Sequence, residues 1–394
     1  MRTVLVTGSG GSGRTTVAAA TALAAARRGK RTLLLSGEAG ALLDVPVGTR
    51  PDEVTDGLWA ARVDSGAHFR AELLALQERS TAALDLLGAH KLEDAELTEL
   101  PGTEEFALLK AVRELPAGDW DTVVVDMPPV RETIALLGLP EQLRRYLRRL
   151  LPPERQAARA LRPMLAQLAG VPMPAQWLYE TAARWESELA AVQKLIEDAH
   201  TSVRLVAEPG PAAEDSLRTA RLGLALYGMR VDTLVANRIL PPETPDPWLA
   251  GLRAQQEKVL HAWHEEWTPG SALRELPHLG RDPRGLDDLT PLTAMTVLYG
   301  EPVAANAAGL GPWRVEGPRD DGDLHWILPL PGAVKDELQL VRRGDELLLA
   351  VGPFRRIVPL PSALRRCTVS GAGLTDGELR VRFTPDPGLW PRSR

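Results

Sequence analysis

The sequence predicts an α/β fold, in which helices cover a mostly parallel sheet and helical insertions interrupt it, followed by a small all-β sandwich. Up to about residue 302, short apolar runs alternate with longer segments of helical periodicity, which is typical of a parallel sheet wrapped by helices. After that point, apolar and polar residues alternate over short runs separated by Gly-Asp and Asp-Gly turns. This second pattern is typical of antiparallel strands.

The first strand is expected over residues 1–7 and the first helix over residues 16–28, with a glycine-rich loop between them. Further strands are expected over residues 31–36, 122–126, 203–208 and 231–237. Ligands of parallel sheets collect at the carboxyl ends of the strands, beside such a loop. The polar side chains at these ends are Glu38, Asp126, Glu208 and Asn237.

The glycine-rich loop is interpreted as a phosphate-binding loop. Gly8 and Gly13 have the spacing of a Walker A motif, and Thr15 follows in register. Backbone N–H groups and the start of the next helix suit a phosphate chain, and a threonine hydroxyl suits Mg²⁺. The alternative is a glycine-rich turn that only joins a strand to a helix. The residues expected to contact the nucleotide are Gly8, Ser9, Gly10, Gly11, Ser12, Gly13, Arg14, Thr15 and Thr16.

Asp126 closes an apolar strand, which is the Walker B arrangement, where the carboxylate holds Mg²⁺ through water. Capping of the next helix is the alternative role for this residue. Together with the loop, it predicts a three-layer P-loop NTPase fold with Thr15 and Asp126 at the Mg²⁺ site. Arg14 stands where lysine is expected, and a planar guanidinium cannot replace a compact ammonium as a point charge on the phosphates. The loop therefore indicates a nucleotide but leaves hydrolysis open.

Composition limits the other possibilities. A chain of 394 residues exceeds the usual size of a single hydrophobic core, so two domains are expected. The 46 basic and 52 acidic residues give a net charge of −6, which argues against nucleic-acid binding. Cys367 is the one cysteine, so a disulfide framework or a thiolate site for zinc or a metalloid cannot form within the chain. With no signal-peptide segment or long apolar stretch found, we expect a cytoplasmic protein without an integral membrane segment.

The loop and its neighbours resemble the ArsA/Get-type ATPases of the MinD-like class, which include the arsenite-pump ATPase and the targeting factor for tail-anchored membrane proteins. The resemblance covers about residues 1–300, with matching segments at 36–40, 101–105, 126–137, 139–146 and 236–241. It implies ATP and Mg²⁺ as cofactors and a homodimer that closes around ATP as a switch. It also implies that Asn237 reads the adenine edge, with residues 277–283 on the other side of the base. A strand-end turn residue is the alternative role for Asn237.

Several positions depart from the family pattern. Ser9 stands where the family has a lysine that reaches across the dimer, and Arg14 stands where it has the usual lysine of the loop. Glu38 stands where the family has an aspartate that orients the attacking water. Arg131 stands where the second switch segment usually has glycine. The resemblance implies that Arg14 contacts the phosphates, that Glu38 orients the attacking water and that Asp126 holds Mg²⁺. We expect a weakly hydrolysing ATPase switch; the alternative is a catalytically silent, nucleotide-binding or nucleotide-free scaffold with a chaperone-like role.

Helical insertions are expected at about residues 66–100 and 140–200, where leucines recur at helical spacing. In the targeting members of the resembled family such helices form a groove for a hydrophobic protein client. Ordinary packing of these stripes is the alternative, and the six methionines of the chain favour it. One helical face of the second insertion is basic and is expected to be solvated, with contact to an anionic partner or membrane surface as the alternative. Its residues are Arg144, Arg145, Arg148 and Arg149.

The C-terminal part is divided into a linker at 303–312, a sandwich at 313–385 and a tail at 386–394, after a nucleotide-binding domain at 1–302. Two stretches, at 330–340 and 373–381, resemble the α-crystallin domain of small heat-shock proteins. Exposed sheet edges of such a domain could capture an extended segment or a second copy. A domain that only supports the nucleotide-binding part is the alternative.

Overall fold

The computed structural model describes residues 1–63, 103–115, 119–151, 176–267, 272–294, 313–318, 322–386 and 388, with isolated positions between 70 and 97. The chain divides into two compact units. Unit 1 comprises Met1–Ala61, Gly118–Ile134 and Ala199–Arg394, and unit 2 comprises Arg62–Ala117 and Ala135–Asp198. The expected linker at 303–312, most of the insertion at 66–100 and nearly all of the tail lie outside the described residues.

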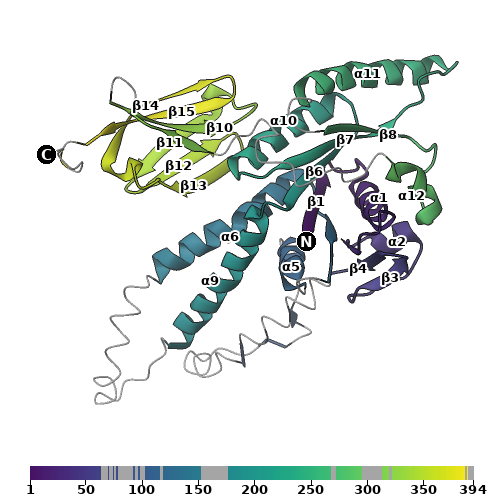
Figure 1. The fold of residues 1–394 in the computed structure, drawn as a ribbon, viewed down its shortest axis with the longest axis horizontal. Helices are drawn as coiled ribbons and strands as arrows, with labels where there is room; N and C mark the ends of the chain where they lie inside the picture. Colours follow the sequence, from purple (N-terminus) through teal and green to yellow (C-terminus); the bar gives the residue numbers. More distant parts are fainter. Residues whose placement is uncertain are drawn as a thin grey trace. The chain divides into compact units, whose positions relative to one another are not determined.

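An eight-stranded sheet forms the centre of unit 1, with the order β3-β4-β2-β5-β1-β6-β7-β8 (Figure 1). Its strands are β1 Arg2–Gly8, β2 Thr32–Leu35, β3 Asp52–Thr55, β4 Leu58–Ala61, β5 Thr122–Asp126, β6 Thr201–Ala207, β7 Val231–Ile239 and β8 Ala272–Pro277. The strands pair in parallel except for the β3–β4 hairpin at one edge. The predicted mostly parallel α/β sheet is therefore confirmed, and β3, β4 and β8 are additions to it.

The strand order fixes which polar residues meet. β1 lies between β5 and β6, and its register aligns Val6 with Asp126 and Gly8 with Val206. The apolar residues of β1 and β5 are fully buried, as expected for strands that are covered on both faces. The loop after β1 consequently starts at the same sheet edge at which β5 ends.

Helices α1 Arg14–Ala26, α2 Ala39–Leu43 and α12 Gly285–Thr293 share a hydrophobic core with the sheet. Alanines of α1 fill much of that core and let the helix pack closely on the strands. The predicted helix at 16–28 is displaced toward the N-terminus. Gly13 has a left-handed φ of 86° and the helix begins directly after it, while Gly29, with a φ of 74°, follows its end.

Unit 1 also contains α10 Pro211–Leu226 and α11 Pro247–Trp267, whereas α6 Val130–Leu150 begins in unit 1 and continues in unit 2. Unit 2 further contains α5 Thr103–Glu114 and α9 Gln176–Glu197. Within unit 2, Arg144 donates to Glu186 at 3.0 Å and to Gln193 at 2.6 Å, so the basic face predicted to be solvated is partly engaged by α9. Among the described residues, no helix combines the length and apolarity needed to cross a membrane.

The C-terminal part of unit 1 is an all-β sandwich, as predicted (Figure 1). One sheet has the order β14-β15-β10-β9 and the other β11-β12-β13, with antiparallel pairing throughout. The strands are β9 Arg314–Glu316, β10 Leu324–Pro329, β11 Leu338–Arg343, β12 Glu346–Val351, β13 Phe354–Pro359, β14 Cys367–Thr375 and β15 Glu378–Pro385. Alternate residues of β15 are buried, including Phe383, whereas β10, which contains Trp326, is buried at all but one position.

Candidate nucleotide-binding site

The loop between β1 and α1 needs glycine at the two positions that have the Walker A spacing, Gly8 and Gly13. A Cβ at Gly8 would lie 1.9 Å from the backbone oxygen of Val206, where the loop passes the end of β6. A Cβ at Gly13 would lie 2.3 Å from Nδ2 of Asn237, and the backbone there is left-handed. A Cβ at Gly10 would meet nothing within 4 Å. The two outer glycines thus permit close approach, whereas the middle of the loop is open.

Three side-chain hydrogen bonds hold the loop. Ser12 Oγ donates to the Ser9 carbonyl at 2.8 Å, and Asn237 Nδ2 donates to the Ser12 carbonyl at 2.8 Å. Ser9 Oγ donates to Ser216 Oγ of α10 at 3.0 Å. The amide of Asn237 was expected to read adenine, and the structure places its donor on the backbone of the loop.

Asp126 lies beside Thr15 and Ser36, as its place at the end of β5 predicts. Ser36 Oγ donates to Asp126 Oδ2 at 2.8 Å, and the Thr15 hydroxyl also donates to this carboxylate. Burial raises the pKa of Asp126, because it outweighs the opposing effects of these two hydrogen bonds and of the Arg14 charge. A half-buried carboxylate between two hydroxyl groups is a set of hard oxygen donors, which is the chemistry that Mg²⁺ prefers.

Arg14 contacts the segment that follows Asp126. Its Nη1 donates to the carbonyl of Met127 at 2.6 Å. Glu38, expected to orient a water, is exposed, and its backbone N–H donates to Ser36 Oγ at 3.2 Å. Arg131 is exposed in the first turn of α6. Of the charged residues singled out by sequence, Arg14 and Glu38 therefore lie next to Asp126, whose pKa responds to both of their charges.

A group of three oxygens fixes the start of α6 to β1. The hydroxyls of Thr7 and Thr133 lie 2.7 Å and 2.8 Å from the Pro128 carbonyl and 3.0 Å from each other. Sequence reasoning missed these contacts and the role of Ser36 and Ser216. Ser36 and Thr133 stand within the segments that carry the family resemblance, which is the one signal that could have drawn attention to them.

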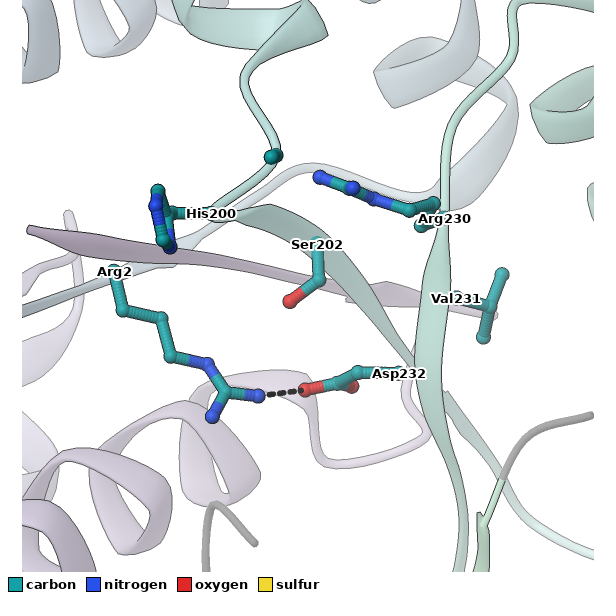
Figure 2. A pocket seen from close by; sticks show the side chains of 7 residues that line it. Arg2, His200, Ser202, Arg230, Val231 and Asp232 are labelled. Atoms are coloured by element: carbon teal, nitrogen blue, oxygen red, sulfur yellow. Dashed lines mark ion pairs between the residues drawn. The ribbon is translucent and has the colours of Figure 1, made fainter. Parts of the chain in front are cut away.

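A small pocket lies at the opposite end of the central strands (Figure 2). Arg2 begins β1, whereas the phosphate loop follows the end of that strand, so the pocket is separate from the loop. Its side chains are already paired in part, since Arg2 lies 3.5 Å from Asp232, which also forms an ion pair with buried Arg204 at 3.1 Å. The lining residues are Arg2, Ala199, His200, Ser202, Arg230, Val231 and Asp232.

Parallel sheets that present a glycine-rich loop and a carboxylate at neighbouring strand ends are those of P-loop nucleotide-binding proteins, and this chain is of that class. The family model for the anion-transporting ATPase (ArsA) matches residues 1–299, and the model for the HSP20-like domain found in ArsA matches residues 321–383. The chain belongs to the ArsA ATPase family and carries its HSP20-like domain.

Relatives of this chain span its full length. An uncharacterised protein of Streptomyces coelicolor is 58% identical over 401 residues, which cover 100% of both chains. A protein of Mycobacterium tuberculosis is 30% identical and covers 99% of this chain and 97% of its own. A protein of Aquifex aeolicus named as an arsenical pump-driving ATPase is 26% identical and covers 97% of this chain and 99% of its own. The combination of the two domains is therefore shared by these proteins over their whole lengths.

Proposed function

We propose that this protein binds ATP with Mg²⁺ at the loop Gly8–Thr16, hydrolyses it slowly, and acts as a homodimeric switch in the cytoplasm. The observation that carries the proposal is the convergence of Thr15, Ser36 and Asp126 at the end of the loop. Three separate segments of the chain supply these oxygens. Burial raises the pKa of Asp126 and so disfavours its charged form, which a bound cation would stabilise.

Thr15 and Asp126 would hold Mg²⁺, and the backbone N–H groups of the loop would hold the phosphates. When bound, Mg²⁺ neutralises negative charge on the phosphate oxygens. Gly13 places the N-terminus of α1 behind the loop, so the positive end of the helix dipole also faces the anion. These features support binding even without a lysine in the loop.

Slow hydrolysis is proposed because the groups around the phosphates differ from those of an efficient ATPase. Ser9 carries no charge and is engaged by Ser216, while Arg14 is engaged by the Met127 carbonyl. Glu38 is exposed and longer than the aspartate it replaces. A misplaced catalytic group can reduce a rate by a factor of about 100.

A silent scaffold is the second candidate, and the engagement of Ser9 and Arg14 by groups of the same chain favours it. In that case the HSP20-like sandwich would supply the activity by binding an extended segment of a hydrophobic protein client at a sheet edge. We do not extend the arsenical-pump role named for some relatives to this chain. Cys367 is its one cysteine and is buried, whereas metalloids prefer several thiolates.

Calorimetry with Mg-ATP, together with phosphate release, tests the proposal on the full chain. The wild-type protein should bind ATP, and Asp126→Asn should abolish both Mg²⁺-dependent binding and turnover. The exposed aspartate Asp119 precedes the same strand, so Asp119→Asn is a matched control and should behave as wild type.

Absence of Mg-ATP binding would refute the ATPase proposal. Tight binding without phosphate release, with turnover gained in a Ser9→Lys, Arg14→Lys double variant, would identify the silent form. Sedimentation with and without ATP tests the dimer.

A further inference from the structure

Helix α10 contacts the phosphate loop near its first turns. Ser216 accepts the hydrogen bond from Ser9 Oγ at 3.0 Å. Ser9 stands where the resembled family has a charged residue, and here it forms a contact within its own chain. A change in the position of the loop backbone at Ser9 therefore acts directly on α10.

The middle of α10 contacts both α6 and the sandwich at a glycine. A Cβ at Gly223 would lie 2.7 Å from Cδ1 of Ile134 and 2.7 Å from Cζ of Phe354. Ile134 is in the first turns of α6 and Phe354 begins β13, and their exposed fractions are 1% and 8%. Three elements far apart in sequence thus meet at one position, where a Cβ would require the Ile134 or Phe354 side chain to shift.

The end of α10 is bound by the sandwich through β13. Arg356 Nη1 donates to the Leu226 carbonyl at 2.7 Å, and the Tyr227 hydroxyl donates to the Arg355 carbonyl at 3.1 Å. The Arg356 guanidinium also lies 5.4 Å from the centre of the Tyr227 ring and 4.9 Å from that of Trp313. The last carbonyls of a helix lack helical donors and carry its negative dipole end, so a cation placed there stabilises the junction.

The start of α6 is connected to the phosphate loop by a second route. Arg14 donates to Met127, and the hydroxyls of Thr7 and Thr133 fix the Pro128 carbonyl. Ile134, the α6 residue that contacts Gly223, follows Thr133 directly. A phosphate that draws the Arg14 guanidinium toward the loop alters the hydrogen bond at Met127 and with it the start of α6.

We propose that the HSP20-like sandwich responds to occupation of the phosphate site through α10 and the start of α6. In this arrangement nucleotide binding at the loop changes the packing of β13 on α10, and a change in β13 in turn changes the loop. The reciprocal effect is required because coupling between two sites is a single free energy. The nucleotide arm of this proposal rests on the proposed ATP binding, while the reciprocal arm needs no ligand.

Amide hydrogen exchange on the full chain tests the coupling in both directions. Without nucleotide, Phe354→Ala should raise exchange in the loop, residues 8–13, by about fivefold or more, the lower end of typical coupling. With Mg-ATP, exchange in residues 351–357 of the wild-type protein should change, and Phe354→Ala should lose that response. Arg356→Gln removes the bond to Leu226 with less loss of packing, and it serves if Phe354→Ala does not fold.

A pair of glycine variants supplies the matched control. Gly223→Ala inserts a methyl group between Ile134 and Phe354, whereas Gly251→Ala adds one to α11, where a Cβ meets nothing within 4 Å. Gly223→Ala should alter loop exchange, and Gly251→Ala should not. Folded Gly223 and β13 variants with loop exchange equal to that of Gly251→Ala would overturn the coupling. So would Mg-ATP binding, shown by calorimetry, without any change in residues 351–357. Absence of ATP binding would refute the ATPase proposal alone, and the ligand-free arm would still decide the coupling.

Discussion

Replacing Asn237 tests whether its amide holds the phosphate loop or reads the base. Its Nδ2 donates to the Ser12 carbonyl at 2.8 Å, and the exposed fractions of the two residues are 6% and 2%. Removing the donor leaves a buried carbonyl without this partner, which costs about 1–3 kcal/mol. Asn237→Asp has a further cost, since it places a carboxylate oxygen against the carbonyl oxygen. Both variants should therefore lower the free energy of unfolding, Asn237→Asp more than Asn237→Ala.

The loop must be ordered to bind phosphate, so the same energy should also appear in the affinity. We expect Asn237→Ala to weaken nucleotide binding by roughly 5- to 150-fold, which corresponds to about 1–3 kcal/mol. ATP and GTP should weaken by the same factor, because the loop contacts phosphates and not the base. Calorimetry with both nucleotides and urea unfolding measure the two effects. Gln255 lies on α11 and is exposed, so Gln255→Ala is the control that should change neither quantity appreciably.

An unequal effect on the two nucleotides would refute this reasoning. If Asn237→Ala keeps the wild-type free energy of unfolding but changes the ratio of ATP to GTP affinity by tenfold or more, the amide reads the base. The role implied by the family resemblance would then be correct, and the contact with Ser12 would be incidental.

Three other predictions follow from the same contacts. Gly13→Ala should lower the free energy of unfolding by about 2–4 kcal/mol, because it strains a left-handed backbone and displaces the Asn237 amide from the Ser12 carbonyl. Gly10→Ala should stay within about 0.5 kcal/mol of wild type, and urea unfolding measures both variants. Burial raises the pKa of Asp126, so its ionised form destabilises the ligand-free fold at neutral pH, and this penalty fades as the pH falls through the raised pKa. Asp126→Asn should accordingly raise the thermal midpoint at about pH 8, with a difference that shrinks in acid; a constant difference would contradict the assignment. Asp232→Asn should cost about 3–5 kcal/mol because it removes the negative charge that buried Arg204 faces, while loss of the exposed pair in Asp215→Asn should cost under about 1 kcal/mol in the same assay.

The strands that sequence alone could predict are the ones buried on both faces. β1, β2, β5, β6 and β7 contain short runs rich in apolar residues, and the structure places each of them within about two residues of the predicted bounds. The edge strands β3 and β8 are largely exposed or half-buried and have no such run. β4 has buried residues but only four positions, too few for a periodic signal.

The candidate site, like the fold, could be predicted only where the residues concerned are marked by a local sequence pattern. Thr15 and Asp126 could be predicted because a motif of fixed spacing and a strand end mark them. The partners that hold the loop lie far away in sequence: Ser36 and Asp126 are 90 residues apart, Arg14 and Met127 are 113 apart, and Ser9 and its partner in α10 are 207 apart. Such pairs form because β2 lies beside β5 and β1 lies between β5 and β6, an order that no local pattern reveals.

Arginine at position 14 is compatible with nucleotide binding because its side chain has more hydrogen-bond donors than a lysine. A guanidinium has five N–H donors in a planar fork, and Nη1 of Arg14 uses one direction of that fork on the Met127 carbonyl. Guanidinium N–H groups are also donors of the kind that bind phosphate oxygens. A lysine ammonium is a compact charge that would interact with the phosphates without this fixed second contact. In the coupling proposed above, a phosphate would draw this guanidinium away from Met127, so the residue that weakens the case for rapid hydrolysis would also connect the phosphate site to the start of α6.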